Sequence, residues 1–276
     1  MTFAFQYLII ERMKNRIVLK FVALTYLMAW SCWFAVIILM NFNIIKYGDI
    51  LFMSLYLLGG ICPSLAGIIA IRKSKSDYQV LKTELCKFKV NVLWYMGIFS
   101  IPLFLSGLSW LLNLLLVGKS GPFLTNSIWA AIPMLPVMII GGGSEEIGWR
   151  GVMLPQLFKK MSVLKASLLI AIIWGVWHLP LWFIKGVPQY GSSFIFFMGG
   201  TFSLSFMLSI IYIRTRSVFV CILFHAIENA YLNIGLDSWA LVKTSSLLIV
   251  LVSLLIPLLL FRVFNLTRQG CRPVMP

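Results

Sequence analysis

Two adjacent carboxylates, Glu145 and Glu146, follow an apolar run that ends at Ile140. A charge at membrane depth costs several kcal/mol on insertion scales, so such residues are rare and usually have a task. Glu146 and Arg150 are four residues apart and share a helical face, whereas Glu145 points about 100° away. We expect Arg150 to hold Glu146 while Glu145 faces a cavity as a general base. A solvated Glu–Arg pair at a helix end would have the same spacing.

The second polar group is His178, which follows Trp174 by four residues, so that both side chains share a helical face. Pro180 then limits the helix and frees carbonyl groups nearby. A single histidine beside tryptophans is ordinarily a hydrogen-bonded packing residue. Taken alone, His178 therefore does not establish a catalytic site.

The third group is His225 with Asn229, again four residues apart and on one face. Asparagine offers two N–H donors and histidine one or two, which suits a developing oxyanion. Glu228 could orient the His225 imidazole or pair elsewhere, and a polar clamp between helices is the plainer alternative. The three segments together hold both histidines and three of the eight acidic residues, which favours one shared site.

The composition is that of a polytopic membrane protein. The chain has 276 residues, of which 61% are apolar and 11% charged, against about 45–50% and about 25% in soluble domains. Because a spanning helix needs roughly 20 apolar residues, we predict an all-α, single transmembrane domain over 1–276 whose motif region is 141–232. The eight predicted spans are 17–40, 50–71, 91–117, 126–148, 163–184, 193–213, 217–236 and 242–261.

The net charge of +15 does not require a nucleic-acid partner. With these spans, 19 of the 23 Lys and Arg residues fall on one side, which predicts that both termini are cytoplasmic in a multi-pass plasma-membrane protein. Five scattered cysteines suggest neither a disulfide framework nor a zinc knuckle. We expect the first apolar run to be a retained anchor, and Cys271, sixth from the end, does not form a prenylation box.

The motifs GGGSEEIGWRGVMLPQL, WGVWHLPLWF and LFHAIENA resemble the CPBP family of intramembrane proteases, also called the Abi or CAAX protease family. That family includes the type II CAAX prenyl endopeptidase. Its marks, E-E-x-x-x-R, an aromatic residue with His four residues on, and H-x-x-x-N, occur here in the family's order. The stretch around Pro63 also resembles a family feature in an early span. The resemblance covers mainly 141–232, about a third of the chain.

The resemblance implies an all-helical membrane fold and hydrolysis of a peptide bond in a membrane-tethered peptide or protein. It implies that Glu145 activates water with help from His178, and that His225 and Asn229 stabilise the oxyanion. Glu146 and Arg150 would position the site. The biological roles that it suggests are CAAX-type processing and bacteriocin self-immunity.

The family is labelled a metalloprotease, and a metal-free, glutamate-driven mechanism is also argued for it. Glu145, His178 and His225 could hold a divalent metal such as zinc with an open water position. The sequence contains no H-E-x-x-H pair on one helix, however, and the three ligands would come from three helices. We expect no tightly bound metal, or a weakly held divalent ion.

Two other classes of function stay open at this point. Buried carboxylates and histidines also form proton relays, so a proton-coupled transporter is one alternative. The Gly-Pro break near Pro63 has no clear counterpart in the second half, as a transporter with inverted repeats would need. The other alternative is a non-catalytic immunity or scaffold protein that binds a partner in the membrane.

Overall fold

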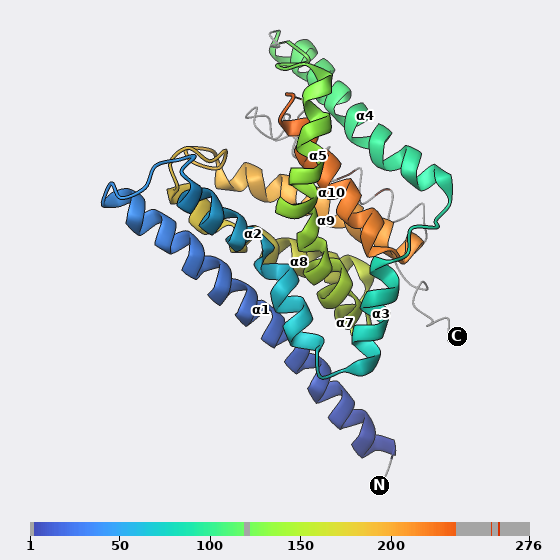
Figure 1. Ribbon diagram of the computed structural model, residues 1–276. Coiled ribbons are helices and arrows are strands. Elements are labelled where there is room, and N and C mark those ends of the chain that lie inside the picture. The colour runs from blue at the N-terminus through green and yellow to red at the C-terminus, as the bar shows by residue number, and fades with distance from the viewer. Residues whose placement is uncertain (1–2, 119–121, 236–254, 256–258, 260–276) are drawn as a thin grey trace.

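The computed structural model describes residues 3–118 and 122–235, together with residues 255 and 259. Within these residues the secondary structure is helical and no strand occurs, which confirms the predicted all-α class (Figure 1). The main helices are α1 (Phe3–Asn41), α2 (Ile50–Ile71), α3 (Lys75–Leu85), α4 (Val92–Val117), α5 (Ala131–Gly141), α8 (Val163–Trp177), α9 (Phe194–Thr215) and α10 (Val218–Leu232).

Five helical stretches in the described residues are long and apolar enough to cross a membrane, and they confirm a multi-pass protein. They are Arg16–Asn41, Ile50–Ile71, Ile128–Phe158, Val163–Phe183 and Phe194–Thr215; Val92–Leu108 and Val218–Leu232 are shorter apolar helices. These seven stretches match seven of the eight predicted spans. The eighth, 242–261, lies almost entirely outside the described residues.

The fourth span differs from its predicted end at residue 148, because helical structure continues to Phe158. Its winding changes along the way: a 3-10 turn, η2 (Gly143–Glu145), leads into α6 (Glu146–Gly148), a π turn, η3 (Trp149–Met153), and α7 (Leu154–Phe158). Single π turns inside helices are frequent at functional sites. The charged residues therefore lie within this helical stretch and not at its end.

Small residues let α2 pack tightly against this irregular segment. Gly148 lies so close to the carbonyl of Pro63 that a Cβ atom at this position would overlap with it. The Ser64 hydroxyl donates to the carbonyl of Ser144 at 2.5 Å, one residue before the first carboxylate. Pro63 itself lies inside a continuous α2, so it does not break that span. Close backbone approach at small residues is a common way of packing membrane helices.

Aromatic side chains fill the centre of the molecule between α1, η3 and α8. Trp33, Trp149 and Trp177 are almost completely buried. The Trp177 ring centroid lies 4.8 Å from that of Trp33 and 6.1 Å from that of Trp149. Offset and edge-on ring pairs at such distances are favourable. This cluster forms a rigid wall beside the carboxylates, at the end of α8 that carries His178.

Candidate active site

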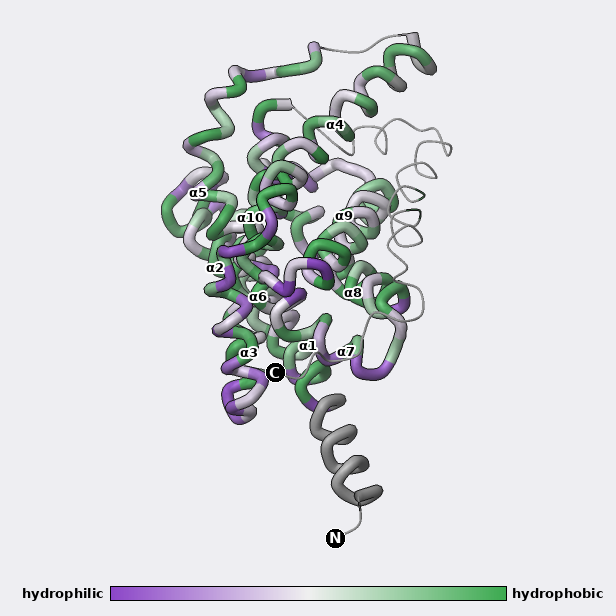
Figure 2. Tube along the Cα trace, turned by 90° about the vertical axis from the view of Figure 1, so that its right-hand side faces the viewer, coloured by the Kyte–Doolittle hydropathy of each residue, from purple (hydrophilic) through white to green (hydrophobic). Residues whose placement is uncertain are grey.

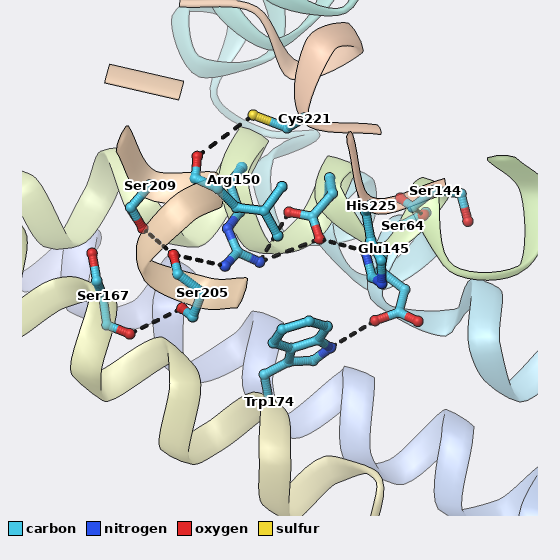
Figure 3. Close-up of polar contacts among 12 residues, drawn as sticks. Ser64, Ser144, Glu145, Arg150, Ser167, Trp174, Ser205, Ser209, Cys221 and His225 are labelled. Atoms are coloured by element: carbon cyan, nitrogen blue, oxygen red, sulfur yellow. Dashed lines mark hydrogen bonds and ion pairs between the residues drawn. The ribbon is translucent and has the colours of Figure 1, made fainter. Parts of the chain in front are cut away.

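Glu146 and Arg150 form a completely buried ion pair, as their spacing predicts. An Nη1 atom of Arg150 lies 2.9 Å from Oε2 of Glu146, and both side chains have no exposed surface. The Nη2 group also donates to the carbonyl of Ser205 on α9 at 3.2 Å, and the guanidinium lies 5.3 Å from the ring centre of Trp174 (Figure 3). Arg150 thus connects the π turn to α8 and α9.

The same carboxylate orients His225. Nδ1 of His225 lies 2.8 Å from Oε1 of Glu146, and because a carboxylate only accepts, Nδ1 carries the proton. His225 can then donate from Nε2 only when both ring nitrogens carry a proton. The sequence also offers Glu228 as a possible partner for this imidazole. In the structure Glu146, from a different helix, makes that contact.

Glu145 points away from this ion pair, toward Trp174. The indole Nε1 of Trp174 donates to Oε2 of Glu145 at 2.7 Å, and the close-up shows the indole N–H directed at this carboxylate (Figure 3). Only 5% of the Glu145 surface is exposed. The sequence singled out Trp174 as a neighbour of His178 on α8. Its bond to the carboxylate was missed, since the two residues are 29 positions apart.

His178 ends α8, and its ring is held in one orientation. Its Nδ1 atom lies 2.8 Å from the carbonyl oxygen of Trp174, which can only accept, so Nδ1 carries the proton. The neutral ring therefore presents the Nε2 lone pair. Its faces and edges pack against Trp177 and Phe197, with centroid distances of 4.5 and 5.0 Å. Nε2 can therefore accept a hydrogen bond from water.

A cavity of about 630 Å³ joins these groups. Its wall contains the side chains that the motifs predicted to meet, and these come from η2, α8 and α10. The apolar part of the wall comes from α2, α5, α8 and α9. The polar and ionisable lining residues include Glu145, His178, Gln189, Thr201, His225, Glu228 and Asn229. Glu146 and Arg150 are not among the lining residues and stand behind the wall. The first carboxylate thus faces the cavity while the second is held by arginine.

Gly142 brings the α10 donors up to the cavity wall beside the carboxylates. A Cβ atom at Gly142 would overlap with Nδ2 of Asn229 and would lie 3.3 Å from Nε2 of His225. Both nitrogens therefore rest against the backbone that leads into Glu145. The neighbouring Gly141 carbonyl in turn lies against Gly60 of α2, where an added Cβ would approach it to 3.2 Å. Gly142 therefore lets the side chains of Asn229 and His225 approach closely at the cavity wall.

The proposed metal ligands do not form a coordination cluster. Among the described residues, no group of three or more His, Cys, Asp and Glu side chains is arranged to hold a metal ion. One oxygen of Glu145 accepts from Trp174 and each imidazole uses Nδ1 for a protein contact, so each offers one remaining ligand atom. The donor types suit zinc, but their arrangement does not fit it. We therefore derive no catalytic step through a metal.

The arrangement supplies the parts of a hydrolytic site. A carboxylate and an imidazole with a free lone pair face the same cavity as an imidazole and an amide that can donate. Glu228 and Gln189 also line it and were not among the predicted site residues. The sequence singles out Glu228 only as a possible partner of the His225 imidazole, three residues away on the same helix. Gln189 lies in the loop before α9, where no periodic pattern places a side chain.

Comparison with known proteins agrees with the motifs. Residues 123–231 match the family described as Type II CAAX prenyl endopeptidase Rce1-like. A curated relative, CAAX prenyl protease 2 of Methanococcus maripaludis, is 32% identical over 108 residues, an alignment that covers 36% of this chain and 39% of the relative. The similarity thus spans well under half of the relative's length. It confirms the resemblance first inferred from spacing. Residues 123–231, which carry every motif of the site, are thus similar to the Rce1-like type II CAAX prenyl endopeptidases.

Proposed function

We propose that this protein is an intramembrane endopeptidase that cleaves a peptide bond in a membrane-associated protein or peptide. One observation carries the proposal: Glu145 and His178 line the same cavity as His225 and Asn229. Acyl transfer needs a base near the attacking water and donors near the oxyanion. The similarity of residues 123–231 to type II CAAX prenyl endopeptidases supports a protease that acts at the bilayer.

In the proposed reaction, a water molecule lies between Glu145 and the Nε2 lone pair of His178. The Glu145 carboxylate takes a proton from this water as the oxygen attacks the scissile carbonyl carbon. The developing oxyanion is stabilised by Nδ2 of Asn229 and by the N–H of the His225 imidazolium. As the carbon–nitrogen bond breaks, the proton passes from Glu145 to the leaving amine. One proton of the water thus reaches the amine product, and the other stays on the oxygen that joins the new carboxyl group.

The substrate is a segment that enters from the bilayer or its surface, because the cavity lining is largely apolar and aromatic. The relative from Methanococcus maripaludis is called a CAAX prenyl protease, so CAAX-type processing is one role that we propose. Self-immunity against a bacteriocin is the other. We further propose that the protein lies in the plasma membrane with both termini in the cytoplasm, on the basis of its Lys and Arg distribution.

The test is mass spectrometry of peptides released when purified protein is reconstituted with membrane proteins. The wild-type protein should release fragments that Glu145→Gln does not, while both retain the same thermal unfolding profile. Asp49→Asn removes an acid from the loop before α2, outside the cavity, and should keep full activity. Undiminished cleavage by Glu145→Gln would overturn the role of this base. Proton-coupled flux across vesicles without any cleavage would favour a transporter.

A further inference from the structure

Helix α3 is fixed to the protein by its two acidic side chains. Oδ1 of Asp77 accepts from Nε2 of Gln156 on α7 at 3.0 Å and lies 3.5 Å from Nζ of Lys159. Seven residues later, Oε2 of Glu84 accepts from the hydroxyl of Tyr212 on α9 at 2.7 Å. Residues seven apart lie on one side of a helix, so both acids of α3 face the protein.

The outer side of α3 and its flanks is consequently basic. Six cationic side chains between α2 and α4 are exposed, whereas the two acidic side chains of the same stretch face the protein. The cationic residues are Arg72, Lys73, Lys75, Lys82, Lys87 and Lys89. We call these residues the basic face. Lys75 and Lys82 are seven residues apart, and Tyr78 between them is 46% exposed. A stripe that mixes lysines with an aromatic ring is typical of helices that lie at a membrane surface.

The position of α3 places this face next to the bilayer. The apolar helix α2 ends at Ile71, and α3 begins only four residues later at Lys75. In Figure 2 the hydrophilic colour of α3 stands beside the lower ends of the apolar helices. The headgroup region begins where a spanning helix ends. The basic face therefore lies within reach of lipid phosphates on that side.

The inner side of α3 supports the turn that carries Arg150. Leu81 is only 2% exposed, and a Cβ atom on Gly151 would come to 2.5 Å from its Cδ1 atom. Gly151 follows Arg150 directly in the π turn. Gln156, which donates to Asp77, is itself buried two residues after the start of α7. Movement of α3 away from the protein would thus leave the π turn without its cover.

We propose that the basic face binds the headgroups of anionic phospholipids, and that this binding holds α3 against the turn that positions Arg150. Anionic lipid in the adjoining leaflet attracts each juxtamembrane Lys or Arg, and the attraction is lost with added salt. Lipid composition then regulates the proposed protease through the ion pair behind its cavity. The lipid-binding part stands without the proposed function, and only the regulatory part rests on it.

The experiment compares two matched double variants of the full-length protein. Lys75→Gln/Lys82→Gln removes two charges of the basic face, and Lys46→Gln/Lys185→Gln removes two exposed charges from loops predicted to lie on the other side. Each protein, in neutral detergent micelles, is titrated with phosphatidylglycerol, and hydrogen exchange is followed in α3 and in residues 149–153. Phosphatidylcholine, a zwitterionic lipid without net charge, and soluble phosphate, a free anion, serve as the two controls.

We expect phosphatidylglycerol to slow exchange in both segments of the wild-type and control proteins. For the Lys75/Lys82 variant, the phosphatidylglycerol concentration that gives half of the protection should be about 25-fold higher. Each lysine near a membrane surface contributes about fivefold in affinity, and two such lysines are removed. Lipid binding would be overturned if phosphatidylglycerol did not change the exchange, or if it changed the exchange equally in both double variants. Protection only by an acidic protein would also overturn it. If lipid slows exchange but no protein cleaves peptides, the proposed protease is wrong and the lipid site stands.

Discussion

Nδ1 of His225 lies 2.8 Å from Oε1 of Glu146, although the two residues are 79 positions apart in the chain. The other oxygen of that carboxylate lies 2.9 Å from Arg150. One buried carboxylate therefore ties the π turn to α10 and fixes the imidazole that borders the cavity. Its neighbour Glu145 faces the cavity, with one oxygen bound to Trp174. Two adjacent, identical side chains thus have separate tasks.

Replacing each carboxylate by its amide should separate these tasks. Glu146→Gln leaves the Arg150 guanidinium buried without a counter-charge, a change that costs about 3–5 kcal/mol of stability. Glu145→Gln keeps an oxygen that accepts from Trp174 and should unfold close to the wild-type temperature, yet it should lose cleavage. Thermal unfolding in detergent and cleavage assays on the same preparations measure both effects. Equal destabilisation by the two substitutions would contradict this division.

The glycines before the carboxylates offer a neighbouring pair with different surroundings. Gly142→Ala should displace the Asn229 amide and press on His225, because the new Cβ overlaps with the first and approaches the second to 3.3 Å. Gly141→Ala meets only Leu57 at 3.9 Å, an ordinary contact. We expect Gly142→Ala to lower kcat strongly with little loss of stability. Gly141→Ala should retain activity and gain a little helix stability. Comparable kcat values for the two would refute the assignment of these donors.

The indole N–H of Trp174 should matter separately from its ring. Trp174→Phe keeps an aromatic ring between the two histidines and removes the donor to Glu145. A hydrogen bond to a charged group is worth about 1.5–3 kcal/mol, so kcat should fall by about tenfold to about a hundredfold with a smaller change in KM. Tyr95→Phe removes a hydrogen bond from the Tyr95 hydroxyl to the carbonyl of Phe88, two residues that do not line the cavity. It should behave like wild type, and an equal fall in both variants would point to general damage.

Much of this architecture follows from periodicity, and the remainder depends on packing. The length of apolar runs predicts the helices, and a separation of four residues predicts the Glu146–Arg150 pair, because local geometry decides both. The bonds from Glu146 to His225 and from Glu145 to Trp174 join different helices, and no local spacing encodes them. No local spacing predicts the π turn either, in which Arg150 contacts both Glu146 and the carbonyl of Ser205.

Helix α3 lies between the predicted spans 50–71 and 91–117, where the apolar runs predict no helix, although a local helix signal is present. The Ser74 hydroxyl accepts from the amide of Asp77, which is a normal start for a helix. Leu81 and Glu84 then face inward at helical spacing. The apolar stripe is short and includes an acid, so a search for long apolar runs passes over it. The acid can be buried because the Tyr212 hydroxyl donates a hydrogen bond to it, and no local pattern in the sequence predicts that contact.

Metal content distinguishes the two mechanisms that the family suggests. Because Glu145, His178 and His225 do not form a coordination cluster, we expect well below one zinc or other divalent ion per purified chain. A chelator should then leave cleavage unchanged. Elemental analysis of wild-type and His178→Ala protein, purified side by side, measures this directly. A stoichiometric metal that is present in the first and absent from the second would establish a metal site and overturn this expectation.

Glu84, outside the spanning helices, gives a pH dependence of stability. Burial raises the pKa of this carboxyl above its ordinary value of 4.5, while the Tyr212 hydrogen bond and the charges of Arg216 and Lys87 lower it. The folded chain therefore binds this proton more tightly than the unfolded chain does. The stability from this group is fully present below pH 4.5 and is lost as pH rises through the raised value.

Glu84→Gln, which keeps an acceptor for the Tyr212 hydroxyl, removes this dependence. The stability of the variant relative to wild type should therefore increase with pH above 4.5 and level off beyond the raised pKa. Tyr212→Phe removes a contact that lowers the pKa of Glu84. The loss of stability with rising pH should therefore occur at higher pH in this variant than in wild type. Thermal unfolding in detergent across this pH range measures both shifts. A difference between Glu84→Gln and wild type that stays constant from acid to neutral pH would show that Glu84 titrates alike in the folded and unfolded chains.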